Sequence, residues 1–162
     1  TADNARLVSN LHANLGGLYR MNGHPDLARE HMEKSISLLD QFNLLHINDS
    51  IPQIANYAMF LTEQQEPERG ISELQKLSGI IKEYHSDDCL DYAKVQETLG
   101  TIYLMTANLP QAKTHFKRAF KIYEKIWADE PEMIEAKYQE IQELYPQIGF
   151  FIGKNLSGLL TK

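Results

Sequence analysis

The feature that most constrains the fold of this chain is a pattern of residues that recurs along it. The segment Leu15–Ala28, LGGLYRMNGHPDLA, aligns without a gap with Leu99–Ala112, LGTIYLMTANLPQA, which begins 84 residues later. A weaker copy lies halfway between these two segments, at Tyr57–Gly70, YAMFLTEQQEPERG. It differs in residue type but keeps the sizes of the side chains. The sequence therefore predicts three units with a period of 42 residues, which is typical of a repeat architecture.

The first copy is rich in glycine, and this allows two interpretations: a loop that cradles phosphate, or part of a helical unit. A phosphate loop is not expected to recur at a fixed period, whereas a helical unit is. A glycine inside a helix costs about 1 kcal/mol relative to alanine, so Gly16 needs a packing reason. We therefore interpret Gly16 as a point of close helix approach, and Gly23 with Pro25 as the turn that follows.

Each unit is predicted to be two amphipathic helices joined by a short turn, because apolar residues recur at helical spacing. One face of each helix is therefore expected to be an apolar stripe that packs inward. In the first unit the stripe of the first helix comprises Leu7, Leu11, Leu15, Leu18 and Tyr19, and the stripe of the second helix comprises Leu27, Ala28, Met32, Ser35, Ile36 and Leu39. In the middle unit Ser50 is the expected N-cap, and the second stripe comprises Ile71, Leu74, Leu77 and Ile81. In the third unit the stripe of the first helix comprises Val95, Leu99, Ile102 and Tyr103, and the stripe of the second helix comprises Ala112, Phe116, Ala119, Phe120 and Tyr123.

The C-terminal part of the sequence continues the register with a fourth first helix that starts near Pro131. Its expected apolar stripe comprises Ile134, Tyr138, Ile141 and Tyr145. Apolar residues recur again within residues 148–160, and two roles stay open for them. They either pack down as a cap of the array or dock on a second protomer to form a homodimer.

The pattern Leu-Gly-x-x-Tyr, with Ala nine residues after the Tyr, resembles the tetratricopeptide repeat. The third unit carries it at Leu99, Gly100, Tyr103, Ala112, Phe116 and Ala119, and the first at Leu15, Gly16, Tyr19 and Ala28. The usual unit has about 34 residues. The longer period here is similar to that of kinesin light chains and bacterial peptide-sensing regulators.

The resemblance implies an all-α, right-handed solenoid of helical hairpins, with three repeats plus a C-terminal capping helix or pair. The expected repeats span residues 5–46, 47–88 and 89–130, and the fourth helix and cap span residues 131–162. Residues 1–162 are expected to form one domain of this kind.

The resemblance also implies that the first helices of successive units line a concave groove. The groove residues are those that the apolar stripes leave free, and Ala13, Ala55, Thr62, Glu97 and Met105 are among them. The residues that we expect to bind a peptide are Asn10, Asn14, Gly17, Met21, Asn56, Met59, Lys94, Thr98 and Thr101. Asn14 and Asn56 occupy equivalent places, and an amide can both donate to and accept from a peptide backbone.

Composition narrows the classes of function. The formal net charge of −6 argues against a nucleic-acid-binding face, and a single cysteine excludes an internal disulfide. No apolar run approaches the roughly 20 residues of a membrane helix. These properties favour a cytoplasmic protein with no nucleic-acid or membrane partner.

Motifs for chemistry are not found in the sequence, so we expect neither an enzyme nor a metal or other cofactor. His85, Asp87, Asp88 and Cys89 gather in one loop, where an aspartate is expected to cap the next helix; a metal site is the alternative. Lysines recur every four residues on one later helix, at Lys113, Lys117, Lys121 and Lys125. This face is expected to be solvated, and docking of an acidic partner is the alternative.

The expected function is non-catalytic binding of an extended peptide or of a partner helix in the groove. Two alternatives stay open. The first alternative is that the chain is the sensor or scaffold part of a longer bacterial regulator, because it begins directly in the helical pattern. The other alternative is a homo-oligomerisation module that uses the apolar C-terminal segment.

Overall fold

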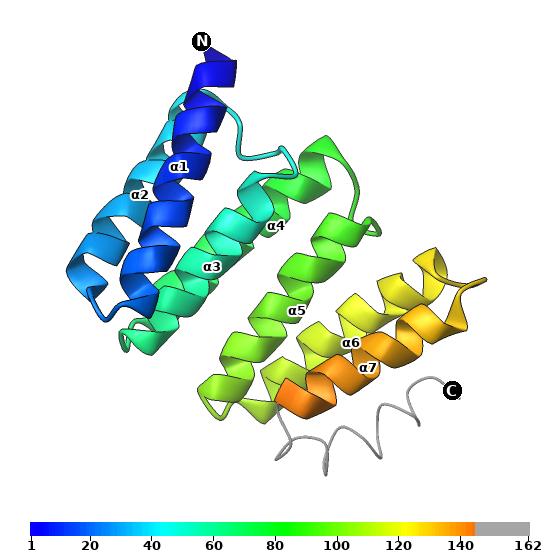
Figure 1. Ribbon diagram of the computed structural model, residues 1–162. Coiled ribbons are helices and arrows are strands. Elements are labelled where there is room, and N and C mark those ends of the chain that lie inside the picture. Colours follow the sequence, from blue (N-terminus) through cyan, green and yellow to red (C-terminus); the bar gives the residue numbers. More distant parts are fainter. Residues whose placement is uncertain (145–162) are drawn as a thin grey trace.

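The computed structural model describes residues 1–144 and places seven α-helices in them, with no strand in that range. The helices are α1 (Ala2–Met21), α2 (Pro25–Gln41), α3 (Ser50–Glu63), α4 (Pro67–Tyr84), α5 (Leu90–Met105), α6 (Leu109–Ile126) and α7 (Pro131–Leu144). Consecutive helices pair as antiparallel hairpins, α1 with α2, α3 with α4 and α5 with α6, and the hairpins follow one another along the array (Figure 1). The predicted all-α helical solenoid is confirmed. Tyr145 and the apolar segment 148–160 lie outside the described residues.

The turn inside each hairpin has the same backbone geometry at the same place in the repeat. Gly23, Gln65 and Ala107 follow at intervals of 42 residues and all have positive φ, of 75°, 65° and 58°. In the first unit the N–H of Gly23 bonds to the carbonyl of Arg20 at 3.2 Å, and that of His24 to the carbonyl of Tyr19 at 2.9 Å. This pair of bonds is the Schellman motif, which recurs in the other two turns and satisfies the last carbonyls of each first helix.

The second helix of every hairpin begins with a proline in its first turn, at Pro25, Pro67 and Pro110. Proline suits this position because its missing N–H has no partner within the helix. The turn and the following proline therefore fix where each first helix stops and each second helix starts.

A pair of small residues marks the crossing of the two helices in each hairpin. The pair is Gly16 with Ala28 in the first unit and Gly100 with Ala112 in the third, but Ala58 with Gly70 in the second. A Cβ added to Gly70 would lie 2.6 Å from the carbonyl oxygen of Ala58, and one added to Gly16 would lie 3.2 Å from that of Ala28. The middle unit thus keeps the small sizes of this pair, with glycine and alanine exchanged between its two helices.

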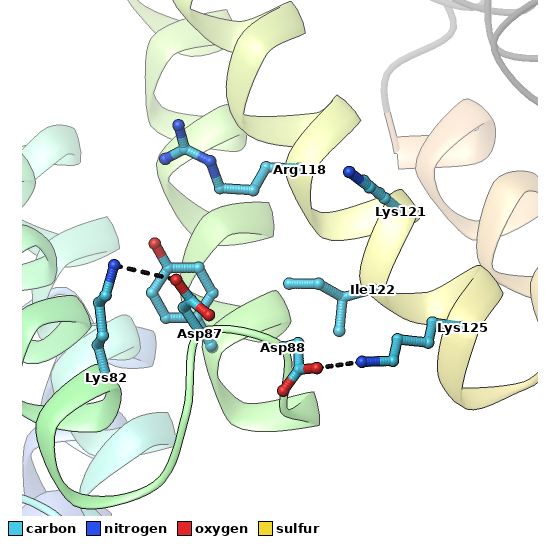
Figure 2. Close-up of a pocket in the computed structure, with 8 residues that line it drawn as sticks. Lys82, Asp87, Asp88, Arg118, Lys121, Ile122 and Lys125 are labelled. Atoms are coloured by element: carbon cyan, nitrogen blue, oxygen red, sulfur yellow. Dashed lines mark hydrogen bonds and ion pairs between the residues drawn. The ribbon is translucent and has the colours of Figure 1, made fainter.

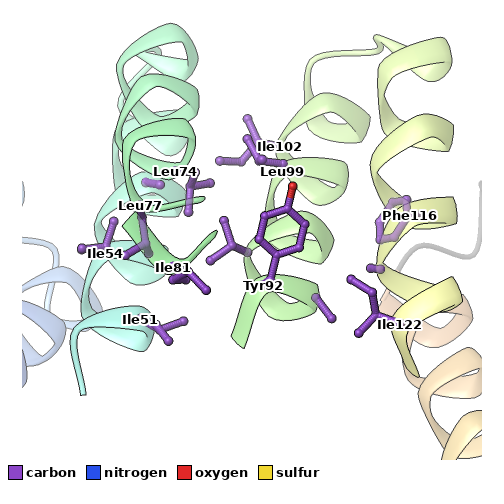
Figure 3. Packing of buried hydrophobic residues seen from close by; sticks show 14 of the residues in the cluster. Ile51, Ile54, Leu74, Leu77, Ile81, Tyr92, Leu99, Ile102, Phe116 and Ile122 are labelled. Atoms are coloured by element: carbon purple, nitrogen blue, oxygen red, sulfur yellow. The ribbon is translucent and has the colours of Figure 1, made fainter. Parts of the chain in front are cut away.

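The main hydrophobic core runs from α2 to α7 and fills the space between consecutive hairpins. Figure 3 shows Leu74, Leu77 and Ile81 of α4 facing Leu99 and Ile102 of α5. A second, smaller cluster joins α2 to α3 through residues that include Met32 and Phe60. The predicted stripes of the middle and third units are buried, apart from the half-buried Ile71 and Tyr103.

The predicted apolar stripe of the first helix was wrong, except for the half-buried Tyr19. Leu7, Leu11, Leu15 and Leu18 are exposed, and the buried residues of α1 are the small Ala5, Ser9 and Gly16. The small residues face α2 because the two helices pack closely, and the leucines lie on a side of α1 where the described residues place no other helix. Leu27, expected in the stripe of α2, is exposed as well.

Two predicted helix caps were also wrong. Ser50 is the first residue of α3, and its hydroxyl donates to the carbonyl oxygens of Leu45 and Ile47 instead of capping the helix. The N-cap of α5 is Cys89, whose Sγ accepts from the N–H of Tyr92 at 3.5 Å. Asp87 and Asp88 pair with lysines instead.

Candidate functional site

An open hollow of about 390 Å³ lies between α1 and the start of α3, where the first two units meet. It is lined by Asn10, Ala13, Asn14, Asp49, Pro52, Gln53 and Asn56. We call it the α1–α3 hollow. It brings together three of the predicted peptide-binding residues, Asn10, Asn14 and Asn56, from two different repeats. Their amides offer both donors and acceptors at one place.

A buried polar network holds one wall of the α1–α3 hollow. The amide oxygen of Gln53 lies 2.8 Å from the hydroxyl of Ser9 and also accepts from the hydroxyl of Ser35. The amide nitrogen of Gln53 donates to Oδ1 of Asn10 at 2.5 Å, so the orientation of the Asn10 side chain is set from the core. Ser9, Ser35 and Gln53 are buried; Ser35 was expected in the inner stripe of its helix, whereas the burial of Ser9 and Gln53 was not predicted.

Two ion pairs join α1 to the second unit, one to the N-cap residue of α3 and one to the last residue of α3. Arg6 pairs with Asp49 at one end, and Arg20 forms two hydrogen bonds with Glu63 at the other, one of them 2.8 Å long. The hydrogen bond from Arg6 lowers the pKa of Asp49, and the hydrogen bond from Asn10 acts in the same direction. The hollow therefore keeps an ionised carboxylate at its rim near neutral pH. Ion pairs at the surface contribute little to the free energy of unfolding, but these two restrict the position of α3 relative to α1.

The other predicted groove residues do not line this hollow. Gly17 faces open space, since a Cβ there would have no neighbour within 4 Å. Met21 and Lys94 are exposed, Thr101 is half-buried, and Met59 packs partly against the core. These five residues stay predictions as peptide contacts.

Hydroxyl groups on the first helices are partly used by the backbone. The hydroxyl of Thr98 donates to the carbonyl of Lys94 at 3.0 Å, so this half-buried residue is less free to bind a ligand than expected. Thr62, expected on the groove surface, is buried, and its hydroxyl donates to the carbonyl of Ala58. Glu97 was also expected there, but it accepts from the hydroxyl of Tyr123 at 2.6 Å and pairs with Lys137.

A second hollow, of about 630 Å³, lies between α4, the loop after it and α6 (Figure 2). It is lined by Lys82, Asp87, Asp88, Tyr92, Arg118, Lys121, Ile122 and Lys125. Lys82 pairs with Asp87 at 2.9 Å, and Lys125 pairs with Asp88. Four cationic side chains thus meet two carboxylates, and a local positive excess results on a chain of net charge −6. Only Lys121 and Lys125 of the predicted lysine face line it.

The buried side chain of Gln96 organises the packing between α4, α5 and α6. Its amide oxygen accepts from Nδ1 of His115 at 2.8 Å and from Arg118 at 3.2 Å, and its amide nitrogen donates to Ser78. The ring of Tyr103 stacks on His115 with a centroid distance of 5.3 Å. Burial lowers the pKa of His115, and the charge of Arg118 lowers it further. Our reading of the sequence did not find this network either.

We expect the lowered pKa of His115 to make the fold less stable in mild acid. The folded chain binds this proton less readily than the unfolded chain, so stability is lost as the pH falls through the ordinary histidine pKa of about 6.5. The melting temperature should decrease between about pH 7.5 and about pH 5, and this decrease should be smaller in His115→Gln. A remaining part is expected from His12, whose pKa burial also lowers. An identical decrease in both proteins would contradict the assignment.

No cluster of three or more His, Cys, Asp or Glu side chains within residues 1–144 is placed to hold a metal ion. None of the described helices is both long and apolar enough to span a membrane.

The stacked hairpins, each with a small-residue crossing and a Schellman turn, define a helical repeat protein with a polar hollow between its first helices. The sequence model of the tetratricopeptide repeat family matches residues 50–125, which run from the start of α3 into α6. This match to slightly less than half of the chain supports the tetratricopeptide repeat resemblance that the sequence pattern predicted. Tetratricopeptide repeats are non-catalytic units that mediate protein–protein interactions. Comparisons with curated proteins and with solved structures found no match.

Proposed function

We propose that the chain binds an extended peptide segment of a partner protein along its first helices, with the α1–α3 hollow as the central contact. The observation that supports this most strongly is the convergence of Asn10, Asn14 and Asn56 in one hollow. A peptide backbone presents an N–H and a C=O at each residue, and an amide side chain can pair with both.

The shape and the charge of the hollow agree with such a ligand. Asn14 and Asn56 are exposed, and Gly17, one helical turn after Asn14, faces open space, so a guest chain has room to approach. Asp49 at the rim is already paired with Arg6, so the lining of the hollow offers no unpaired charge and suits the neutral backbone of a peptide. Asn10 is pre-oriented by Gln53, which reduces the entropy lost on binding.

The expected effect of removing both free amides is a large loss of affinity without loss of stability. A library of random peptides displayed on phage is selected on the chain, and the affinity of a selected peptide is measured by calorimetry. Each lost hydrogen bond is worth about 0.5–1.5 kcal/mol, so Asn14→Ala with Asn56→Ala should weaken binding about tenfold. The melting temperature should stay nearly unchanged because both side chains are exposed.

The matched control is Gln41→Ala with Gln111→Ala, which removes two exposed amides from the second helices α2 and α6. It should leave the affinity for the same peptide unchanged. The proposal fails if the selected peptides bind both double variants equally well, or if the asparagine variant loses its fold.

A further inference from the structure

One face of α1 carries a continuous row of exposed apolar side chains. Leu7, Leu11, Leu15 and Leu18 are exposed to 60%, 55%, 39% and 55%, and Val8 beside them to 40%. Their spacing places them on one side of the helix. The end of a repeat array normally presents a polar outer face to water, so this face is unlike a terminal one.

The repeat itself shows what packs on this face. Leu11, Leu15 and Leu18 correspond, at the 42-residue period, to Gln53, Tyr57 and Phe60 of α3 and to Val95, Leu99 and Ile102 of α5. All six equivalent side chains are buried, none being more than 9% exposed.

In both later units this face receives the second helix of the preceding unit. On α3 it is covered by α2, where Glu33 accepts from the hydroxyl of Tyr57 at 2.7 Å and Arg29 lies over the ring of Phe60. On α5 it is covered by Leu74, Leu77 and Ile81 of α4 (Figure 3).

We infer that the leucine face of α1 is the docking surface for the second helix of a further repeat unit stacked in front of α1. The chemistry of that helix follows from the two examples in the chain. The face of α3 is partly polar and is met by the charged Arg29 and Glu33, whereas the wholly apolar face of α5 is met by leucine and isoleucine. The face of α1 is wholly apolar, like that of α5. The helix that docks on it is therefore amphipathic and carries a stripe of branched apolar residues like that of α4.

The described residues of a second copy do not supply this helix. Within residues 1–144 each second helix already packs against a following helix: α2 against α3, α4 against α5, and α6 against α7. The last of these contacts includes the rings of Phe120 and Tyr138, stacked at a centroid distance of 4.3 Å. An additional unit is therefore a better match than an exchange between two such copies.

The test supplies such a helix in register. A copy of residues 47–88, which contains α3 and α4, is fused directly to Ala5 of the chain; Ala5 is equivalent to Cys89, so the period is kept. We expect the fused α4 to cover the leucine face. The melting temperature should rise by several degrees, and hydrogen exchange of the α1 amides should slow about tenfold relative to the unfused chain.

The matched control is the same fusion with Leu11→Asp and Leu15→Asp. It should show neither the rise nor the slower exchange, while the two substitutions in the unfused chain should change its melting temperature little because both side chains are exposed. The inference is overturned if the fused unit gives no gain, or if the control fusion gains equally. It is also overturned if sedimentation shows that the unfused chain dimerises through this face and that the same two substitutions make it monomeric.

Discussion

Leu99→Ala is expected to lower the free energy of unfolding by about 2–5 kcal/mol, the usual cost of truncating a fully buried leucine. Leu99 is 1% exposed and lies in the main core, where α4 faces α5 (Figure 3). Truncation removes apolar contacts on both sides and leaves a cavity between two hairpins. Denaturant unfolding followed by circular dichroism measures the change.

The matched control for this variant is Leu15→Ala, at the equivalent place in the first unit. Its side chain is exposed in the described structure, so the expected loss is less than about 1 kcal/mol. A loss below about 1 kcal/mol for Leu99→Ala, or equal losses for the two variants, would contradict the register of the repeats.

Gly70→Ala is expected to destabilise the middle hairpin by overpacking. The new Cβ would lie 2.6 Å from the carbonyl oxygen of Ala58 and 3.3 Å from two further backbone atoms of that residue. Backbone atoms cannot turn away as a side chain does, so α3 and α4 must move apart, at a cost of about 1–3 kcal/mol.

The matched control is Gly79→Ala, on the same helix, where an added Cβ has no neighbour within 4 Å. This change should stabilise the chain by about 0.5–1 kcal/mol, because alanine is the better helix former. The same gain partly offsets the loss in Gly70→Ala, so the difference between the two variants isolates the overpacking. Thermal unfolding of both should place Gly70→Ala below the parent chain and Gly79→Ala above it; the reverse order would show that the hairpin is not closely packed at Gly70.

Much of the fold could be predicted because the residue types of the repeat depend on local backbone structure. The spacing of leucine, glycine and tyrosine indicates helices, and Gly23 with Pro25 indicates where the chain turns. The same register placed Asn10, Asn14 and Asn56 on the first helices, and these three residues do line one hollow. Periodicity is sufficient for such features because they depend on neighbours only a few residues, or one repeat, away.

The remaining features depend on neighbours that a pattern does not specify. The leucines of α1 have the same helical spacing as the buried residues of α5, but burial also needs a second helix to cover them. Gln53 and Gln96 look like surface residues in the sequence, yet each is buried because partners from other helices satisfy its amide. The second hollow brings Lys82 of α4 and Arg118 of α6 together, and these two residues come close only because the hairpins stack.

Nuclear magnetic resonance with a phage-selected peptide can locate peptide binding in the α1–α3 hollow. The spectra of backbone and side-chain amides are recorded as the peptide is added to the chain. We expect the largest shifts on the side-chain amides of Asn10, Asn14 and Asn56 and on the backbone of α1 and α3 around them. Shifts confined to the second helices α2, α4 and α6 would contradict binding in the hollow.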